Sequence, residues 1–431
     1  MIAIDMCVAC ALLFVDQFKR GLQTLLGVVR LEDFSRFDVY AHRIRRLDSD
    51  TGQTIPAYLY ILILRHHRTT LLPSLQKLTV SVTSYHKSNF PGILLTISPS
   101  LRDVTLRDIS NKIFAANLLH TILIEAPNIS ELHISKVSHI TPVDVDMIMN
   151  TVVKFRNLHS LTLLFHLNML PFDTLAALSN LQSLRSLYIS IGEQTNDARE
   201  STKPVSFNTL TAFKLYACVN EVSGILSSIY APILTTLLVD FDGAEDDTTL
   251  FAGCIRRCAD ISESLQSLSL TISFGSAQWS TLKALASCRQ LKDMAIICEL
   301  WPMSDDDLLD LCACSAWRNL ESLKLLPNSD TSPYLSLLAL SILADHFPRL
   351  KRLHTSLKVP QDSRPADDPH HPLSTAGEPQ SSHGLEELRI EHASDTKIDK
   401  DIFRHVEQVF PNLKKTEIEH DGDTEDDDED E

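Results

Sequence analysis

The sequence predicts an α/β solenoid: a horseshoe of about 13 irregular repeats with a parallel concave sheet and helices on the convex side. Three observations support this prediction. A six-residue apolar phrase recurs at spacings of 24 to 35 residues, and segments with helical periodicity lie between its copies. The 44% of apolar residues also excludes a wholly disordered chain, while no apolar run reaches the roughly 18 residues that span a membrane.

The recurring phrase has the form Leu-x-x-Leu-x-Leu. Its copies begin at Leu75, Leu101, Ile129, Leu158, Leu184, Leu210, Leu234, Leu265, Leu291, Leu320, Leu350, Leu385 and Leu413. The end of the phrase alternates between apolar and other residues, which is typical of a strand. In one copy we expect Leu161 and Leu163 to point into the core. Leu164 then faces out, and because one strand cannot bury its apolar side alone, the copies must stack.

Helical spacing of apolar residues appears between the phrases. Residues 142–155 and 398–410 show it most clearly. Ser304 precedes three acidic residues and is predicted to cap the start of another helix. Residues 332–347 form a further predicted helix, with Ser332 as its N-cap.

The phrases and their spacing resemble a leucine-rich-repeat horseshoe over residues 70–420. Such repeats usually carry Asn or Cys three residues after the last Leu, and here only Cys218 and Asn328 fit. We therefore expect the buried polar ladder of these repeats to be mostly absent. Loose repeats of this kind are similar to those of fungal F-box proteins.

Residues 31–48 resemble the segment that joins the F-box to the repeats in mushroom-type fungal F-box proteins. The matching positions of the Phe-x-x-Tyr-Ala-x-Arg-Ile-Arg pattern are Phe37, Tyr40, Ala41, Arg43, Ile44 and Arg45. The alternative is an amphipathic helix that caps the first repeat, and we expect residues 1–69 to form an N-terminal helical cap. An F-box opening with Leu-Pro-x-Glu-Leu is not visible, so the resemblance implies that it lies upstream or has been lost.

Two segments differ in composition from the repeats. Residues 358–384 hold five of the 19 prolines and are predicted to be a disordered insertion in the solenoid. Residues 421–431 contain nine acids and no base, which predicts an acidic, disordered tail. The formal net charge is −17, so the other 420 residues carry −8. A net acidic body speaks against nucleic acid as a partner.

The sequence contains none of the common nucleotide-binding, zinc-protease or hydrolase motifs. Cys7 and Cys10 form a single Cys-x-x-Cys pair, and residues 240–247 lack the spacing of a calcium loop. We predict no enzyme, no catalytic residue, no cofactor and no metal site. Nine dispersed cysteines, and a start without a basic segment, favour the cytoplasm or nucleus and no membrane.

A horseshoe offers its concave sheet for binding. In the middle of the array the outward positions include Leu164, Tyr188, Tyr216 and Leu238. Large amphipathic side chains on a rigid surface suit a protein-binding hot spot. The alternative is a scatter of exposed apolar side chains, which is normal for a protein surface.

These observations predict a non-catalytic protein–protein interaction module. The resemblance implies an F-box-like substrate receptor of a ubiquitin ligase, whose repeats select an unknown protein substrate. With an F-box upstream, a Skp-type adaptor and a cullin would be further partners. Two alternatives stay open: a regulator similar to Ran GTPase-activating proteins, which a GTPase stimulation assay would reveal, and a scaffold without a ligase.

Overall fold

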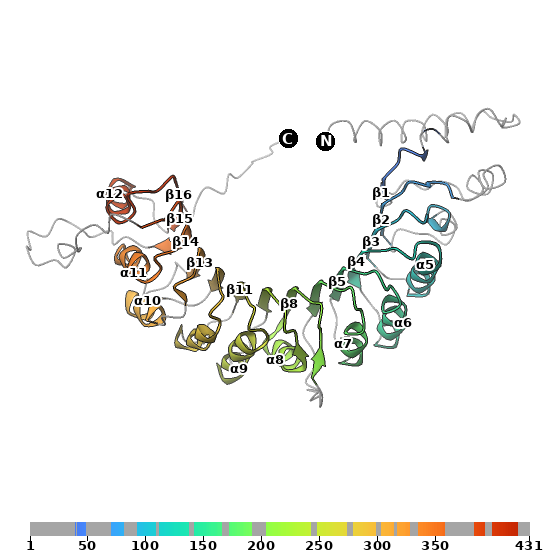
Figure 1. The fold of residues 1–431 in the computed structure, drawn as a ribbon, viewed down its shortest axis with the longest axis horizontal. Coiled ribbons are helices and arrows are strands. Elements are labelled where there is room, and N and C mark those ends of the chain that lie inside the picture. Colours follow the sequence, from blue (N-terminus) through green and yellow to red (C-terminus); the bar gives the residue numbers. More distant parts are fainter. Residues whose placement is uncertain are drawn as a thin grey trace, which may run out of the picture. The chain divides into compact units, whose positions relative to one another are not determined.

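The computed structural model describes residues 39, 41–48, 70–81, 93–108, 112–137, 142–165, 172–191, 204–242, 248–273, 279–298, 303–313, 317–327, 335–357, 383–392 and 399–420. The chain divides into two compact units, Met1–Gly192 and Glu193–Glu431. Each unit is a strand–helix solenoid (Figure 1). The domain boundaries predicted at residues 69 and 421 lie outside the described residues and stay a prediction.

Unit 1 contains a parallel sheet in the order of the chain. Its strands are β1 (Arg46–Asp48), β2 (Lys77–Ser81), β3 (Asp103–Arg107), β4 (Glu131–Val137), β5 (Ser160–Phe165) and β6 (Ser186–Ile191). The described helices are α5 (Lys112–Glu125), α6 (Pro142–Val152) and α7 (Phe172–Leu178). All three lie on the same side of the strands (Figure 1).

Unit 2 repeats this arrangement. Its main strands are β8 (Ala212–Cys218), β10 (Thr236–Asp242), β11 (Ser267–Ile272), β12 (Asp293–Cys298), β13 (Ser322–Pro327), β14 (Arg352–Leu357), β15 (Glu387–His392) and β16 (Lys415–His420). The helices are α8 (Val219–Ser228), α9 (Thr248–Asp260), the 3₁₀-helix η1 (Trp279–Ser287), α10 (Asp305–Cys312), α11 (Leu338–His346) and α12 (Asp399–Val409). A separate pair joins β7 (Val205–Ser206) and β9 (Ile229–Tyr230).

Every copy of the apolar phrase leads into a strand of parallel sheet, which confirms the predicted α/β fold class. Parallel strands in chain order, with the described helices on one side of them, are the architecture of a leucine-rich-repeat solenoid. The helices predicted at 142–155 and 398–410 are confirmed as α6 and α12. Ser304 caps α10 as predicted, in a capping box with Asp307.

The core of each unit lies between its strands and its helices. Leu158, Leu161 and Leu163 are fully buried, as the alternation predicts, and the strands β6 and β8 alternate between buried and half-buried residues along their whole length. Burying one leucine contributes about 1.5–3 kcal/mol. No repeat has a closed core by itself, because each apolar face is covered by the next repeat.

Side chains other than the expected Asn or Cys connect successive repeats. Ser100 donates to the carbonyls of Pro73 (2.7 Å) and Leu75 (2.9 Å), and Ser262 donates to that of Leu234 (2.8 Å). Farther along, Trp317 Nε1 donates to the Leu285 carbonyl at 3.2 Å, and His383 Nε2 donates to the Phe347 carbonyl at 3.0 Å. These buried carbonyls need a donor, so varied hydroxyl and ring N–H groups replace one uniform ladder. Of the two predicted ladder positions, Cys218 is half-buried at the end of β8 and Asn328 lies outside the described residues.

Three local expectations differ from the structure. Arg46–Asp48 form strand β1 rather than part of a cap helix, because the Arg45 carbonyl accepts from the backbone N–H groups of Gln76 (2.8 Å) and Lys77 (2.9 Å) at the edge of the sheet. Helix α11 begins at Leu338, not at Ser332, which lies outside the described residues. His383 is buried, although it lies in the predicted insertion; residues 358–382 and the tail 421–431 are outside the described residues.

Candidate functional site

The side of each sheet that faces away from the helices is the candidate site, and we call it the strand face. Parallel sheets are usually covered on both sides, whereas here the described helices cover only one (Figure 1). The strands pair in register, so equivalent side chains of successive repeats form rows on this face. A rigid backbone with variable side chains in rows suits the recognition of another macromolecule.

On the strand face of unit 1, Leu164 of β5 and Tyr188 of β6 are both half-buried. Tyr188 pairs with Thr162, so the two large side chains are offset by two residues on neighbouring strands, about 8 Å apart in backbone position. Nearby on the same face, burial and then the charge of Arg107 lower the pKa of His133, which favours its neutral form.

On the strand face of unit 2, Tyr216 of β8 and Leu238 of β10 are likewise offset by two residues on neighbouring strands. Tyr216 pairs with Asp240 and Leu238 pairs with Lys214, and both large side chains are half-buried. The structure therefore brings the four predicted site residues together as two pairs, one in each unit. Their joint role as a hot spot stays a prediction.

Two positions at the start of the array are closed to solvent. Thr79 and Thr105 on β2 and β3 are only 1% and 8% exposed. Both are short side chains that lie opposite each other in the register. Beside them, the Lys77 ammonium forms an ion pair with the Asp103 carboxylate across the same two strands. The first repeats thus present mainly this ion pair rather than the threonine hydroxyls.

Charged side chains concentrate on the last strands of unit 2. His354 Nε2 lies 2.7 Å from Glu391 Oε1, and Arg352 reaches past β13 to Asp293 at 3.2 Å. Burial lowers the pKa of His354, while Glu391 opposes that shift. The histidine is therefore mainly neutral near pH 7, and its contact with Glu391 is a hydrogen bond donated by Nε2–H rather than an ion pair.

Arg352 and His354 also line an open hollow of about 300 Å³ on the strand face. Its lining residues are Ser322, Leu323, Lys324, Arg352, Leu353, His354, Glu387, Leu388, Arg389, Lys415 and Glu417. Lys415 forms an ion pair with Glu417 at 2.6 Å, and this hydrogen bond lowers the pKa of Glu417. The hollow mixes fixed donors and acceptors of both charges, which suits polar groups on a protein surface.

These charged side chains were not predicted to form a site. The sequence does contain a signal for this charged site, because Lys324, His354 and Arg389 occupy the same position of three successive phrases. What the sequence could not show is the contact between Arg352 and Asp293, which are 59 residues apart and joined across an intervening strand.

The described residues offer little for catalysis. They contain no group of three or more His, Cys, Asp or Glu residues that could hold a metal ion. Burial raises the pKa of the Cys254 thiol to about 12 and that of Cys288 to about 11, so both stay protonated and unreactive at neutral pH.

Within the part of the chain that the structure describes, no helix has both the length and the apolar character needed to cross a membrane.

No family model and no curated protein matches the chain. Similar solved structures exist. A protein from Bacteroides fragilis is 17% identical with a TM-score of 0.39, covering 58% of this chain and 74% of its own. Rad7 of yeast, solved in complex with Elc1, is 16% identical with a TM-score of 0.39, covering 90% and 92%.

The leucine-rich repeat-containing protein LegL7 of Legionella pneumophila is also similar, at 12% identity and a TM-score of 0.37, covering 87% of this chain and 90% of its own. Likenesses of this degree carry no functional argument. The fold assignment rests on the strand order and registers of the chain itself.

Proposed function

We propose that this protein is a non-catalytic interaction module that binds another protein on its strand face. The observation that carries the proposal is a parallel sheet whose second side none of the described helices covers and which presents aligned rows of large, polar and charged side chains there. The pairs Leu164–Tyr188 and Tyr216–Leu238 are the proposed hot spots. Tyrosine is enriched in such hot spots, because its ring buries a large apolar area and its hydroxyl supplies a polar contact.

We further propose that the module selects substrates for a ubiquitin ligase. The support is the segment from Ala41 to Asp48, part of which matches the joint of mushroom-type F-box proteins. Ala41 is buried, Arg45 Nη1 donates to the Ser74 carbonyl at 3.1 Å, and Arg46–Asp48 pair with β2. Because this segment pairs with the sheet, it would hold a preceding adaptor-binding segment in a fixed direction relative to the first repeats.

Affinity purification of the protein, tagged at its own chromosomal locus, tests this role. We expect a Skp-type adaptor and a cullin to co-purify with the protein and its substrate. Replacing Tyr216 and Leu238 with serine should reduce substrate recovery by about tenfold or more and leave the adaptor unchanged, because the adaptor binds elsewhere. Tyr230, a 53% exposed tyrosine in β9 outside the main sheet, provides the matched control as Tyr230→Ser.

Recovery of substrate without adaptor or cullin would contradict the ligase role and keep the binding role. Equal loss of substrate from the Tyr230→Ser control would contradict the assignment of binding to the strand face.

A further inference from the structure

A second surface of unit 2 lies at the edge where the strands begin. The residues immediately before six successive strands form one row there: Gln266, Lys292, Glu321, Lys351, Glu386 and Lys414. From Lys292 onward the charges alternate. Lys351 forms an ion pair with Glu321 at 2.7 Å and Lys414 forms one with Glu386 at 3.1 Å. Lys292 begins the alternating series, next to the neutral Gln266.

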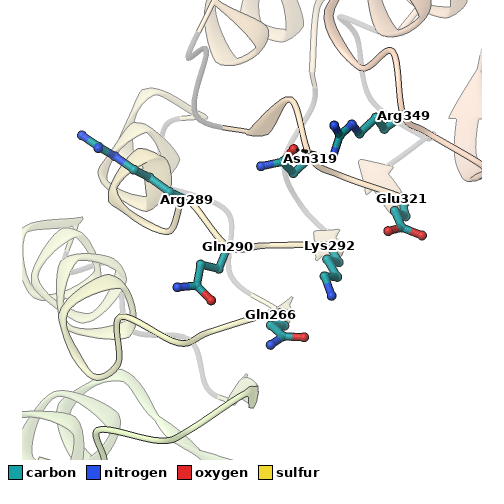
Figure 2. A pocket seen from close by; sticks show the side chains of 7 residues that line it. All are labelled: Gln266, Arg289, Gln290, Lys292, Asn319, Glu321 and Arg349. Carbon is teal, nitrogen blue, oxygen red and sulfur yellow. Dashed lines mark hydrogen bonds between the residues drawn. The ribbon is translucent and has the colours of Figure 1, made fainter.

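A second row lies beside the first, at the position three residues before each strand. It contains Gln290, Asn319 and Arg349, and Arg349 Nη1 donates to Asn319 Oδ1 at 3.0 Å. Figure 2 shows the two rows side by side, with Arg289 projecting away from them. A shallow hollow of about 290 Å³ lies here, and its lining residues are Gln266, Arg289, Gln290, Lys292, Asn319, Glu321 and Arg349.

The hollow is locally basic in an acidic chain. Its lining contains three basic residues, Arg289, Lys292 and Arg349, and one acidic residue, Glu321, which pairs with Lys351 beside the hollow. The hydrogen bond and charge of Lys351, followed by the charges of Lys292 and Arg349, lower the pKa of Glu321. Glu321 thus lies among cations that stabilise its carboxylate, and the amides of Gln266, Gln290 and Asn319 add hydrogen-bond donors to the lining.

We propose that this hollow, which we call the edge hollow, binds an acidic segment of a partner protein through that segment's carboxylates. Lys292 and Arg349 are the principal contacts, because the Lys351 ammonium is already paired with Glu321. Charges at such a rim chiefly set partner choice and association rate. This proposal does not depend on the ligase role.

A nucleic acid fits the edge hollow less well than an acidic peptide. None of the lining residues is aromatic, so the hollow offers no ring on which a base could stack. The net charge of −17 would also repel a long polyanion, whereas a short acidic segment meets mainly the local field within a Debye length of about 8 Å.

The acidic residues 421–431 of the chain itself are the other candidate occupant. They follow β16, which ends at His420, so they leave from the ends of the strands. The edge hollow lies at the strand starts, on the opposite edge of the sheet. A partner segment can approach that edge directly, which is why we assign the hollow to a partner.

Fluorescence anisotropy of the full chain with a labelled ten-residue Asp/Glu peptide tests the proposal. We expect saturable binding that weakens with added salt, and roughly fivefold to tenfold weaker binding for Lys292→Gln/Arg349→Gln. The matched control Arg256→Gln/Arg257→Gln removes the same charge from exposed positions on α9 and should bind like the parent. Glu321→Gln should bind two- to threefold more tightly, because it removes a competing carboxylate.

Four results would overturn the proposal. The first is no saturable binding, and the second is equal weakening by the two double variants. The third is equally strong competition by a single-stranded oligonucleotide of the same charge. The fourth is tenfold tighter peptide binding after the acids of residues 421–431 are changed to amides, which would make the chain's own tail the occupant.

Discussion

Replacing Trp317 with alanine is expected to lower the free energy of unfolding by about 3–5 kcal/mol. Trp317 is fully buried and is among the largest side chains in the core, three residues before the phrase that leads into β13. Its indole Nε1 donates to the Leu285 carbonyl of η1 at 3.2 Å, so one side chain packs two repeats together and satisfies a carbonyl of the preceding one. The substitution leaves both a cavity and an unpaired acceptor.

Urea titrations followed by circular dichroism would measure this loss. Trp317→Phe keeps most of the ring but removes the donor, so it should cost about 1–3 kcal/mol. The neighbouring Arg318 is exposed, and Arg318→Ala should change stability by no more than about 0.5 kcal/mol. If Trp317→Ala were no more destabilising than Arg318→Ala, the packing described for this repeat would be wrong.

Lowering the pH is expected to destabilise unit 2 because it protonates His383. This happens at a higher pH than protonation of the carboxylates. His383 is 4% exposed, its Nε2–H donates to the Phe347 carbonyl at 3.0 Å and its Nδ1 accepts from the Leu385 N–H at 3.2 Å. Both bonds require the neutral Nε2–H tautomer. Burial lowers the pKa of His383, although the Phe347 carbonyl and Asp345 oppose the shift. Protonation of Nδ1 would set its proton against the Leu385 N–H.

The direction of the pH effect follows from this lowered pKa. The unfolded chain protonates His383 near pH 6.5, whereas the folded chain does so only at lower pH. The stabilisation by the neutral ring is therefore complete above pH 6.5 and is lost as the pH falls below it. By pH 5 the loss is at most about 2 kcal/mol for one histidine.

Urea titrations at pH 7.5, 6.5 and 5.5 would test this effect. His383→Asn should be less stable than the parent at pH 7.5 but should lose less stability on acidification. His405 contributes in the same direction, because burial lowers its pKa while its Nε2 contacts the Leu337 carbonyl at 3.1 Å. An unchanged pH dependence in the His383→Asn variant would contradict the assigned tautomer.

The strands were predictable because the information for them is local. The period of two in each phrase identifies both the strand and its buried side, as Leu161 and Leu163 show. The start of α10 was predictable for the same reason, since a capping box is contained within four residues.

Contacts between distant residues were not predictable. Strand β1 contains a single apolar residue, Leu47, and exists because the edge of β2 offers free hydrogen-bonding groups. His383 looked like part of a polar insertion, and its role depends on a carbonyl 36 residues earlier. At the site, the outward positions of Tyr188 and Tyr216 followed from alternation, whereas the Arg352–Asp293 contact depends on the three-dimensional stacking.

The row of alternating charges from Lys292 to Lys414 was predictable only in part. Its members occupy one fixed position of successive phrases, so the pattern of charges was readable once the phrases were aligned. Its two ion pairs, Lys351–Glu321 and Lys414–Glu386, are exposed to solvent and therefore add little to stability.

The central claim, that the strand face binds the partner protein, is tested most directly by photocrosslinking from matched positions. Benzoylphenylalanine would replace Tyr216 on the strand face in one variant and Tyr230 in β9 in the other. We expect the Tyr216 variant to crosslink the same protein that co-purifies with the parent. The Tyr230 variant should give no crosslink to that protein. Crosslinking from Tyr230 but not from Tyr216 would contradict the claim.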